Sequence, residues 1–207
     1  MASSSRDVFI NCPFDAAFVS GFQALVFGVI GCGFRVRCAR EMDDAAETRI
    51  EKLYRIIEQS RYSIHDLSRT ELDVANNLPR FNMPLELGLF LGAKRFGDDD
   101  QKQKKCMIQD TEQYRFQQFI SDLAGMDIKA HDGNPRRMVG HIRDFLVTAS
   151  RRRTIPTSVE LLDSYDRFMA GLPAIAGAAG LDAGNILFPD YERLAQAWVK
   201  ADHGRAI

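Results

Sequence analysis

Glu86 is the one charged residue in residues 81–92, a stretch of the chain that is apolar apart from Glu86 and Asn82. A segment that is apolar on all sides is usually buried, and a buried charge is costly unless it is paired or used. Pro84 suits the first turn of a helix, which Asn82 or Met83 would cap. Glu86 is then expected near a helix N-terminus, where the macrodipole favours the ionised carboxylate of a nucleophile or cation stabiliser. The structural alternative is a buried ion pair with Arg69, Arg80 or Lys94.

The elements that must position Glu86 follow an alternating pattern, which is typical of a parallel α/β sheet. Strands are predicted at residues 8–12, 34–38, 62–67, 106–109 and 128–131. Further helices are predicted at 14–30, from a capping box of Asp44 and Glu47 to residue 59, at 112–124 and at 136–149. Five strands, each followed by a helix, indicate a flavodoxin-like, doubly wound α/β fold with a five-stranded parallel sheet.

A run of basic residues at 151–153 marks a boundary between this α/β domain, residues 1–150, and a C-terminal helical extension, residues 151–207. Two apolar stripes at helical spacing run through the extension, and Asp190 is the expected cap of the second. A helical segment of about 50 residues is too short for a core of its own, so it should dock on the α/β domain or on a second subunit. The charged run at 97–105 is predicted to be a solvated connection.

Composition narrows the classes of function. The chain has 207 residues, 45% of them hydrophobic, and a formal net charge of −1. It therefore lacks the basic field that would favour nucleic acid as the main partner. No apolar run approaches the roughly 20 residues of a membrane span, and the N-terminus does not resemble a signal peptide. The four cysteines lack zinc spacing, and we expect reduced thiols in a cytoplasmic protein without a metal site.

Polar residues follow the first and third predicted strands, at the sheet edge where open α/β folds bind ligands. Asp66 lies near the end of the third predicted strand. Each of the other residues has an ordinary structural alternative, such as a helix cap for Asp15, a turn for Ser68 or Asn82, and a surface charge for Arg69. The second strand leads to Arg40, Asp43 and Asp44 at the same edge. The predicted crevice comprises Asn11, Pro13, Phe14, Asp15, Asp66, Ser68, Arg69, Asn82 and Glu86.

Several common chemistries are excluded by the absence of their motifs. The glycines near residue 30 precede a strand instead of following one, so they do not form a dinucleotide fingerprint. The sequence contains neither a GxxxxGK[ST] phosphate loop nor a GxSxG nucleophile elbow. His65 and His131 fall at strand ends, where a hydrogen-bonded structural histidine is the simpler interpretation.

Four segments together resemble two related families. Residues 7–10, Asp-Val-Phe-Ile, and residues 56–64 resemble the first strand and the third strand with its preceding helix in TIR (Toll/interleukin-1 receptor) domains. Residues 11–14, Asn-Cys-Pro-Phe, resemble the opening of nucleoside 2-deoxyribosyltransferases. Residues 82–88, Asn-Met-Pro-Leu-Glu-Leu-Gly, resemble a segment shared by those transferases and bacterial TIR-like domains. The resemblance covers roughly residues 7–145, although the Trp-Cys pair typical of TIR domains is absent.

The resemblance implies an N-glycosidic site, in which Glu86 acts at the ribosyl carbon and Asp66 orients the sugar. It implies an NAD glycohydrolase in bacterial defence or signalling, with NAD as substrate and no cofactor. A nucleoside deoxyribosyltransferase or nucleosidase is the first alternative, and a non-enzymatic TIR-like assembly or nucleotide-sensing module is the second. The expected partners are a small-molecule nucleotide or nucleoside, further copies of the chain in a homo-oligomer, and an activating protein.

Overall fold

The computed structural model describes residues 4–41, 44, 46–70, 72 and 77–203, with the backbone alone at 203. Five parallel strands form one sheet in the order β2–β1–β3–β4–β5. This is the strand order of flavodoxin-like folds, so the predicted fold class is confirmed. The strands are β1 (Ser4–Asn11), β2 (Arg35–Arg37), β3 (Ser60–Asp66), β4 (Lys105–Asp110) and β5 (Lys129–Ala130).

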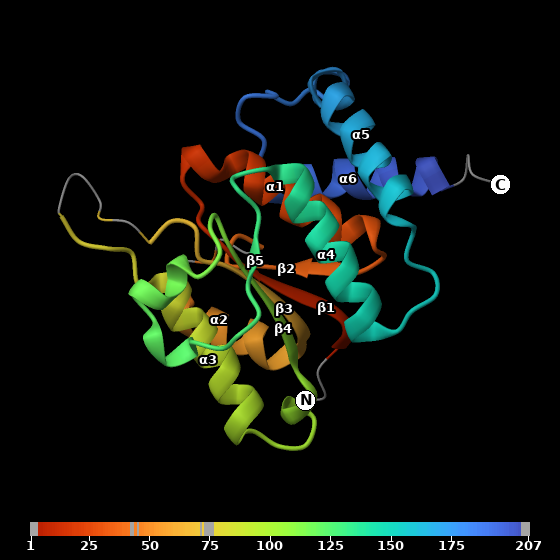
Figure 1. The fold of residues 1–207 in the computed structure, drawn as a ribbon. Coiled ribbons are helices and arrows are strands. Elements are labelled where there is room, and N and C mark those ends of the chain that lie inside the picture. The colour runs from red at the N-terminus through yellow and green to blue at the C-terminus, as the bar shows by residue number, and fades with distance from the viewer. Residues whose placement is uncertain (1–3, 42–43, 45, 71, 73–76, 204–207) are drawn as a thin grey trace.

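Helices cover both faces of the sheet (Figure 1). Helices α1 and α4 pack together on one face, and α2 and α3 cover the other. Alternation along β1 explains this arrangement, because Val8 and Ile10 join the core under α1 and α4 while Phe9 joins the core under α2 and α3. The helices are α1 (Val19–Gly31), α2 (Arg49–Gln59), α3 (Asn82–Phe96), α4 (Pro135–Ser150), α5 (Ser158–Ala178) and α6 (Phe188–His203).

The C-terminal extension forms α5 and α6, which dock on the α/β domain through α1 and α4. The Phe168 ring stacks on the Phe27 ring with centroids 5.1 Å apart. Gly31 allows a close approach, because a Cβ there would lie 2.4 Å from Leu161 Cδ1. Of the two docking modes expected for this segment, the structure shows the one on the α/β domain. Asp190 lies in the first turn of α6, so its expected place as the cap is wrong.

The segment after β4 contradicts the predicted helix at 112–124. It forms two short 3-10 helices, Arg115–Gln118 and Ser121–Leu123, so β4 is not followed by an α-helix. Tyr114 adopts the left-handed region with φ 67°, which interrupts a helix. The cause is Arg115, which turns back to donate to Asp110 Oδ1 and to Leu67 O, each at 2.6 Å. The expected helix at 14–30 also divides, into a 3-10 turn at Ala16–Phe18 and α1.

Two further expectations are corrected at the ends of α2. Its N-cap is Thr48, which accepts the Glu51 N–H, and Glu47 instead pairs with Arg55 at 2.8 Å. The capping box of Asp44 and Glu47 is therefore wrong. The charged run at 97–105 is not simply solvated either, because Lys104 is fully buried. Its ammonium donates to Ile57 O at 2.6 Å and thereby satisfies a carbonyl at the C-terminus of α2.

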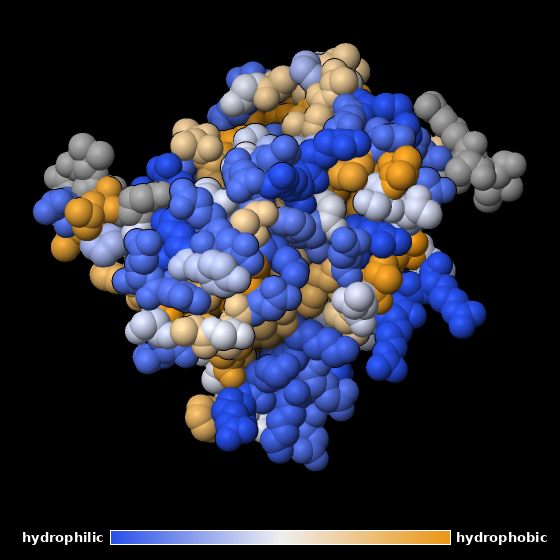
Figure 2. Space-filling view, in the orientation of Figure 1, coloured by the Kyte–Doolittle hydropathy of each residue, from blue (hydrophilic) through white to orange (hydrophobic). Residues whose placement is uncertain are grey.

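The surface fits the balanced composition. Figure 2 shows hydrophilic residues over most of the face in view, with smaller hydrophobic groups among them. Within the part of the chain that the structure describes, none of the helices has the length and apolar character required to cross a membrane.

Candidate functional site

The candidate site lies at the switch point of the sheet, where β1 and β3 end side by side and Asn11 pairs in register with His65. Ligands of open α/β sheets bind in the crevice outside such a point. Burial raises the pKa of the Cys12 thiol directly after β1, and the charges of Asp66 and Glu86 raise it further. Both carboxylates predicted to be catalytic are thus within electrostatic range of one residue at this edge.

Glu86 lies on α3, and only 5% of the residue is exposed. Its charged partner is Arg49, the first residue of α2, whose Nη2 atom lies 3.7 Å from Glu86 Oε1. The Arg49 side chain is 58% exposed, so solvent screens this long contact. The expected partners of Glu86 are wrong, because they bind other groups. Arg69 and Arg80 contact Asp15, and Lys94 donates to Lys104 O.

The ionisation of Glu86 differs from the sequence prediction. Burial raises its pKa from the ordinary value of 4.5 to about 7, and the Arg49 charge opposes this only in part. Helix α3 begins at Asn82 after Phe81 in the N-cap position, so Asn82 and Met83 are helical residues rather than caps. The helix dipole acts most strongly within the first turn, and Glu86 therefore lies beyond the region of its strongest effect. The carboxyl group is consequently poised to gain or lose a proton near neutral pH.

Asp66 ends β3 and is fully buried among donors. Ser68 donates both its hydroxyl and its backbone N–H to Asp66 Oδ1, the latter at 3.0 Å. Gln109 Nε2 donates to Oδ2 at 3.0 Å. His131 Nε2 lies 3.2 Å from Oδ2, at ion-pair distance but without hydrogen-bond alignment. Asp66 therefore joins the ends of β3, β4 and β5.

Asn11 is a second buried polar connector. Its Nδ2 atom lies 2.9 Å from His65 Nδ1 and donates to Met83 O at 2.8 Å. The other ring nitrogen of His65 is 2.9 Å from Ser63 Oγ, and burial lowers the pKa of His65 to about 3. His65 is therefore a neutral, hydrogen-bonded histidine. Asn11 thereby links β1 and β3 to the first turn of α3, and Glu86 lies further along the same helix.

The turn after β1 gathers basic side chains. Pro13 is buried, and the Phe14 ring packs edge-on against Phe22 with centroids 5.2 Å apart. Asp15 precedes the 3-10 turn but makes no side-chain cap bond. Its Oδ2 atom instead lies 3.4 Å from Arg69 Nε and 3.3 Å from Arg80 Nη1.

Contacts between the predicted residues thus form three separate groups. Asp66 contacts Ser68, Asp15 contacts Arg69, and Asn11 contacts the start of α3. Asn82 is exposed at the beginning of α3. Asp43, which the sequence also places at this edge, lies outside the described residues. Sequence reasoning missed Arg49 and Gln109, which contact Glu86 and Asp66 respectively. Gln109 could have been found from the sequence, because it lies near the end of the strand that neighbours the strand of Asp66.

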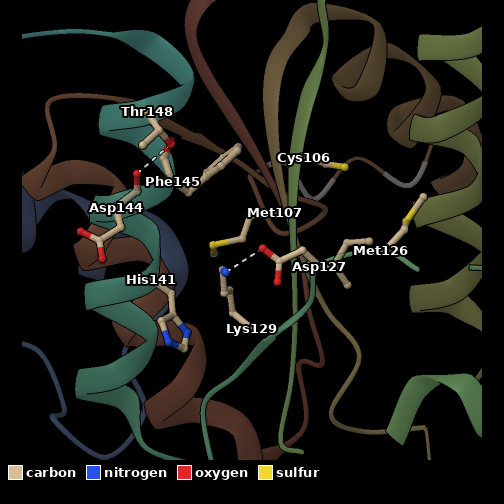
Figure 3. Close-up of a pocket in the computed structure, with 10 residues that line it drawn as sticks. Cys106, Met107, Met126, Asp127, Lys129, His141, Asp144, Phe145 and Thr148 are labelled. Carbon is tan, nitrogen blue, oxygen red and sulfur yellow. Dashed lines mark hydrogen bonds and ion pairs between the residues drawn. The ribbon is translucent and has the colours of Figure 1, made fainter. Parts of the chain in front are cut away.

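A hollow with a volume of about 780 Å³ lies beside β4, between α4 and the segment that enters β5. Figure 3 shows side chains of α4 facing those of β4 and of the segment entering β5. Lys129 pairs there with Asp127 at 2.9 Å, and burial lowers the pKa of His141. Both carboxylates of this hollow, Asp127 and Asp144, are exposed. The buried acid that distinguishes the switch point therefore has no counterpart among these lining residues.

Neither models of known protein families nor curated proteins give a significant match to this sequence. The class that the structure defines is an open, doubly wound α/β protein with a buried, titratable glutamate at its switch point. Across the described ranges of the chain, no cluster of three or more His, Cys, Asp or Glu side chains is arranged to hold a metal ion.

Proposed function

We propose that the protein cleaves the ribosyl C–N bond of a nucleotide, with Glu86 as the reacting carboxylate and NAD as the leading substrate. The observation that carries this proposal is the state of Glu86. It is 5% exposed, contacts one mostly exposed arginine at 3.7 Å, and has a pKa raised to about 7. Burial of a carboxyl group costs free energy, and one distant arginine compensates little of that cost. Such a group is a candidate for chemistry at a ligand site.

Cleavage of a ribosyl C–N bond develops positive charge on the sugar ring. A carboxylate fixed beside that carbon either stabilises the cation or captures it as an ester. The growing positive charge also lowers the pKa of Glu86, because an opposite charge nearby favours the ionised form. With a pKa of about 7, ionised Glu86 is present near neutral pH, and this ionised form is the one that reacts.

The leaving group favours NAD over a nucleoside. Nicotinamide leaves NAD as a neutral molecule, whereas a purine or pyrimidine usually requires a proton from an acid. Asp66 and Asp15, the two other acids predicted for this site, are both engaged by protein groups. Asp66 accepts from Ser68 and Gln109, and Asp15 faces two arginines. The orientation of the sugar by Asp66 stays a prediction.

A nucleosidase or deoxyribosyltransferase is the second candidate, and the same pKa favours it. At a pKa of about 7, part of the Glu86 population is protonated and can donate to a departing base. The two candidates differ in their pH dependence. Cleavage that needs ionised Glu86 rises as the pH increases through 7, and cleavage that needs protonated Glu86 falls. A pH–rate profile from 5 to 9 separates them.

The remaining expectations form part of the same proposal. They are a role in bacterial defence or signalling, a cytoplasmic location, a homo-oligomer and an activating protein partner. The non-enzymatic TIR-like module is the competing interpretation, and it requires that Glu86→Gln leave function intact. Light scattering of the purified full chain measures the oligomeric state directly.

The test is base release, followed by liquid chromatography with mass detection. The wild-type chain, Glu86→Gln and Glu51→Gln are incubated with NAD, NADP and a panel of nucleosides and deoxynucleotides. Glu51 is an exposed glutamate on α2 and serves as the matched control. We expect nicotinamide release by the wild type and by Glu51→Gln, and none by Glu86→Gln. Equal release by all three proteins would refute the role of Glu86.

A further inference from the structure

The hollow between α4 and β4 reaches the edge of strand β4. Strand β5 has two residues, and in the described part of the chain it pairs with β4 only at Gln109 and Asp110. Residues 106–108, three consecutive positions of β4, line the hollow. Successive side chains of a strand point to opposite faces, so a wall made of three consecutive residues includes the edge of the strand. We call this space the β4 hollow.

The opposite wall of the β4 hollow is one face of α4. Its lining residues are spaced three and four positions apart, namely His141, Asp144, Phe145 and Thr148. Figure 3 shows the Phe145 and His141 side chains extending from α4 toward the strands, and the Met107 side chain extending toward α4. The volume of about 780 Å³ falls within the roughly 300–1,000 Å³ of small-molecule sites, which are typically lined by apolar and aromatic side chains.

His141 adds a polar atom that lacks compensation. Its Nδ1 atom is buried and has no hydrogen-bond partner among the residues that the structure describes. Burial lowers the pKa of His141, the charges of His131 and Lys129 lower it further, and Asp144 opposes them. The ring is therefore neutral at pH 7.5. A buried nitrogen without a partner costs free energy, and a ligand that hydrogen-bonds to Nδ1 would remove this cost.

The charged groups beside the β4 hollow are paired with one another. Asp127 Oδ2 lies 2.9 Å from Lys129 Nζ, and Asp144 Oδ1 lies 3.1 Å from Arg143 Nη1. Two carboxylates thus face two cations, and the pairs leave an excess of neither sign. The balance favours a neutral ligand, because an ion would lose its hydration in the hollow without gaining a counter-charge.

We propose that the β4 hollow binds a neutral aromatic molecule that carries a hydroxyl group, with the ring against Phe145 and Met107 and the hydroxyl on His141 Nδ1. A hydroxyl group both donates and accepts, so it pairs with Nδ1 in either tautomer of a neutral imidazole. The flexible thioether of methionine adapts to aromatic rings and contacts them favourably. Glu86 does not line this hollow, and the inference is independent of the proposed function.

The test is equilibrium dialysis of the full chain at pH 7.5 against 2-naphthol, naphthalene and 2-naphthoate, which share one ring system. We expect one molecule of 2-naphthol to bind per chain, about 5-fold more tightly than naphthalene, because naphthalene leaves Nδ1 unpaired. 2-Naphthoate is an anion at this pH and should bind more weakly than 2-naphthol.

Two substitutions locate the binding. His141→Phe keeps an aromatic ring but removes the ring nitrogens, so the preference for 2-naphthol over naphthalene should disappear. Phe145→Leu removes the aromatic wall and should weaken binding of both neutral probes about 5-fold. Phe96→Leu is the matched control, because Phe96 ends α3 and is 86% exposed.

Absence of saturable 2-naphthol binding would overturn the proposal, as would equal affinities for 2-naphthol and naphthalene. Tighter binding of 2-naphthoate than of 2-naphthol would contradict a neutral ligand. A preference for 2-naphthol that survives His141→Phe would place the binding elsewhere on the protein. The two Phe→Leu variants decide the question even where His141→Phe does not fold, since equal affinities in both would also overturn the proposal.

Discussion

Two buried carboxylates at the same edge of the sheet have opposite surroundings. Asp66 is fully buried and accepts hydrogen bonds from Ser68 and Gln109. Glu86 is 5% exposed, and its charged partner is Arg49, at 3.7 Å and largely in solvent. The first carboxylate has replaced its lost water with protein donors, and the second has not.

This difference in surroundings indicates that Asp66 supports the fold and that Glu86 serves a ligand. Ser68 after β3 and Gln109 on β4 donate to Asp66, and His131 after β5 lies at ion-pair distance, so the carboxylate links the strand ends. Glu86 contributes little to the fold and carries a raised pKa, which is the expected cost of keeping a carboxylate available for a ligand. The comparison predicts that removing the two charges changes stability in opposite directions.

The largest expected effect on stability is a gain from Glu86→Gln. The folded-state pKa of Glu86 is about 7, above the ordinary value of 4.5. A carboxyl group with a higher pKa in the folded than in the unfolded state stabilises the fold by binding a proton. This contribution is complete at pH values below the unfolded-state pKa, and it is lost as the pH rises through 7. At pH 8 the substitution should therefore raise the free energy of unfolding by up to about 3 kcal/mol.

Urea unfolding of the wild type and of Glu86→Gln at pH 5 and pH 8 measures this effect. The gain should be largest at pH 8 and shrink toward pH 5. A loss of stability at pH 8 would show that the Glu86 carboxylate supports the fold, and the contrast with Asp66 would then fail.

Asp66→Asn should have the next largest effect, with the opposite sign. The amide group replaces one acceptor oxygen with a donor that faces either Ser68 or Gln109. A buried donor facing another donor should reduce the free energy of unfolding by about 1–3 kcal/mol. The control is Asp99→Asn, because the Asp99 side chain is 97% exposed and should tolerate the change. Equal unfolding curves for both variants would remove Asp66 from its structural role.

Arg49→Gln should have the smallest effect. Removing the one charge that opposes burial should raise the pKa of Glu86 further, by less than about one unit because Arg49 is screened by solvent. The midpoint of the pH dependence described above should then move to higher pH. An unchanged midpoint would mean that Arg49 does not act on Glu86 in solution.

Local patterns predicted most of the fold. Alternating apolar strands and helices gave the five-stranded parallel sheet, and the apolar run around Glu86 gave its burial. The helix predicted at 112–124 failed because Phe116, Ile120 and Leu123 have helical spacing, yet they pack around two 3-10 turns. The bond of Arg115 to Asp110 that produces those turns is a tertiary contact, and periodicity does not encode it.

The site was less predictable than the fold for the same reason. Position at strand ends identified Asp66 and Asn11, but not which polar groups satisfy them. Arg49 was missed because the helix was predicted to start near residue 44, whereas Thr48 caps it and places Arg49 at its first position beside α3. The macrodipole argument for Glu86 failed because α3 begins at Asn82 and burial dominates.

Nicotinamide release from NAD, measured together with urea unfolding at pH 8 on the same samples of wild type and Glu86→Gln, tests the role of Glu86 most directly. We expect the variant to lose release at least about 1000-fold, a size in keeping with loss of a group that acts on the transition state, while it becomes more stable. Retained release would contradict the catalytic role of Glu86, and lost release with lost stability would assign the carboxylate to the fold instead.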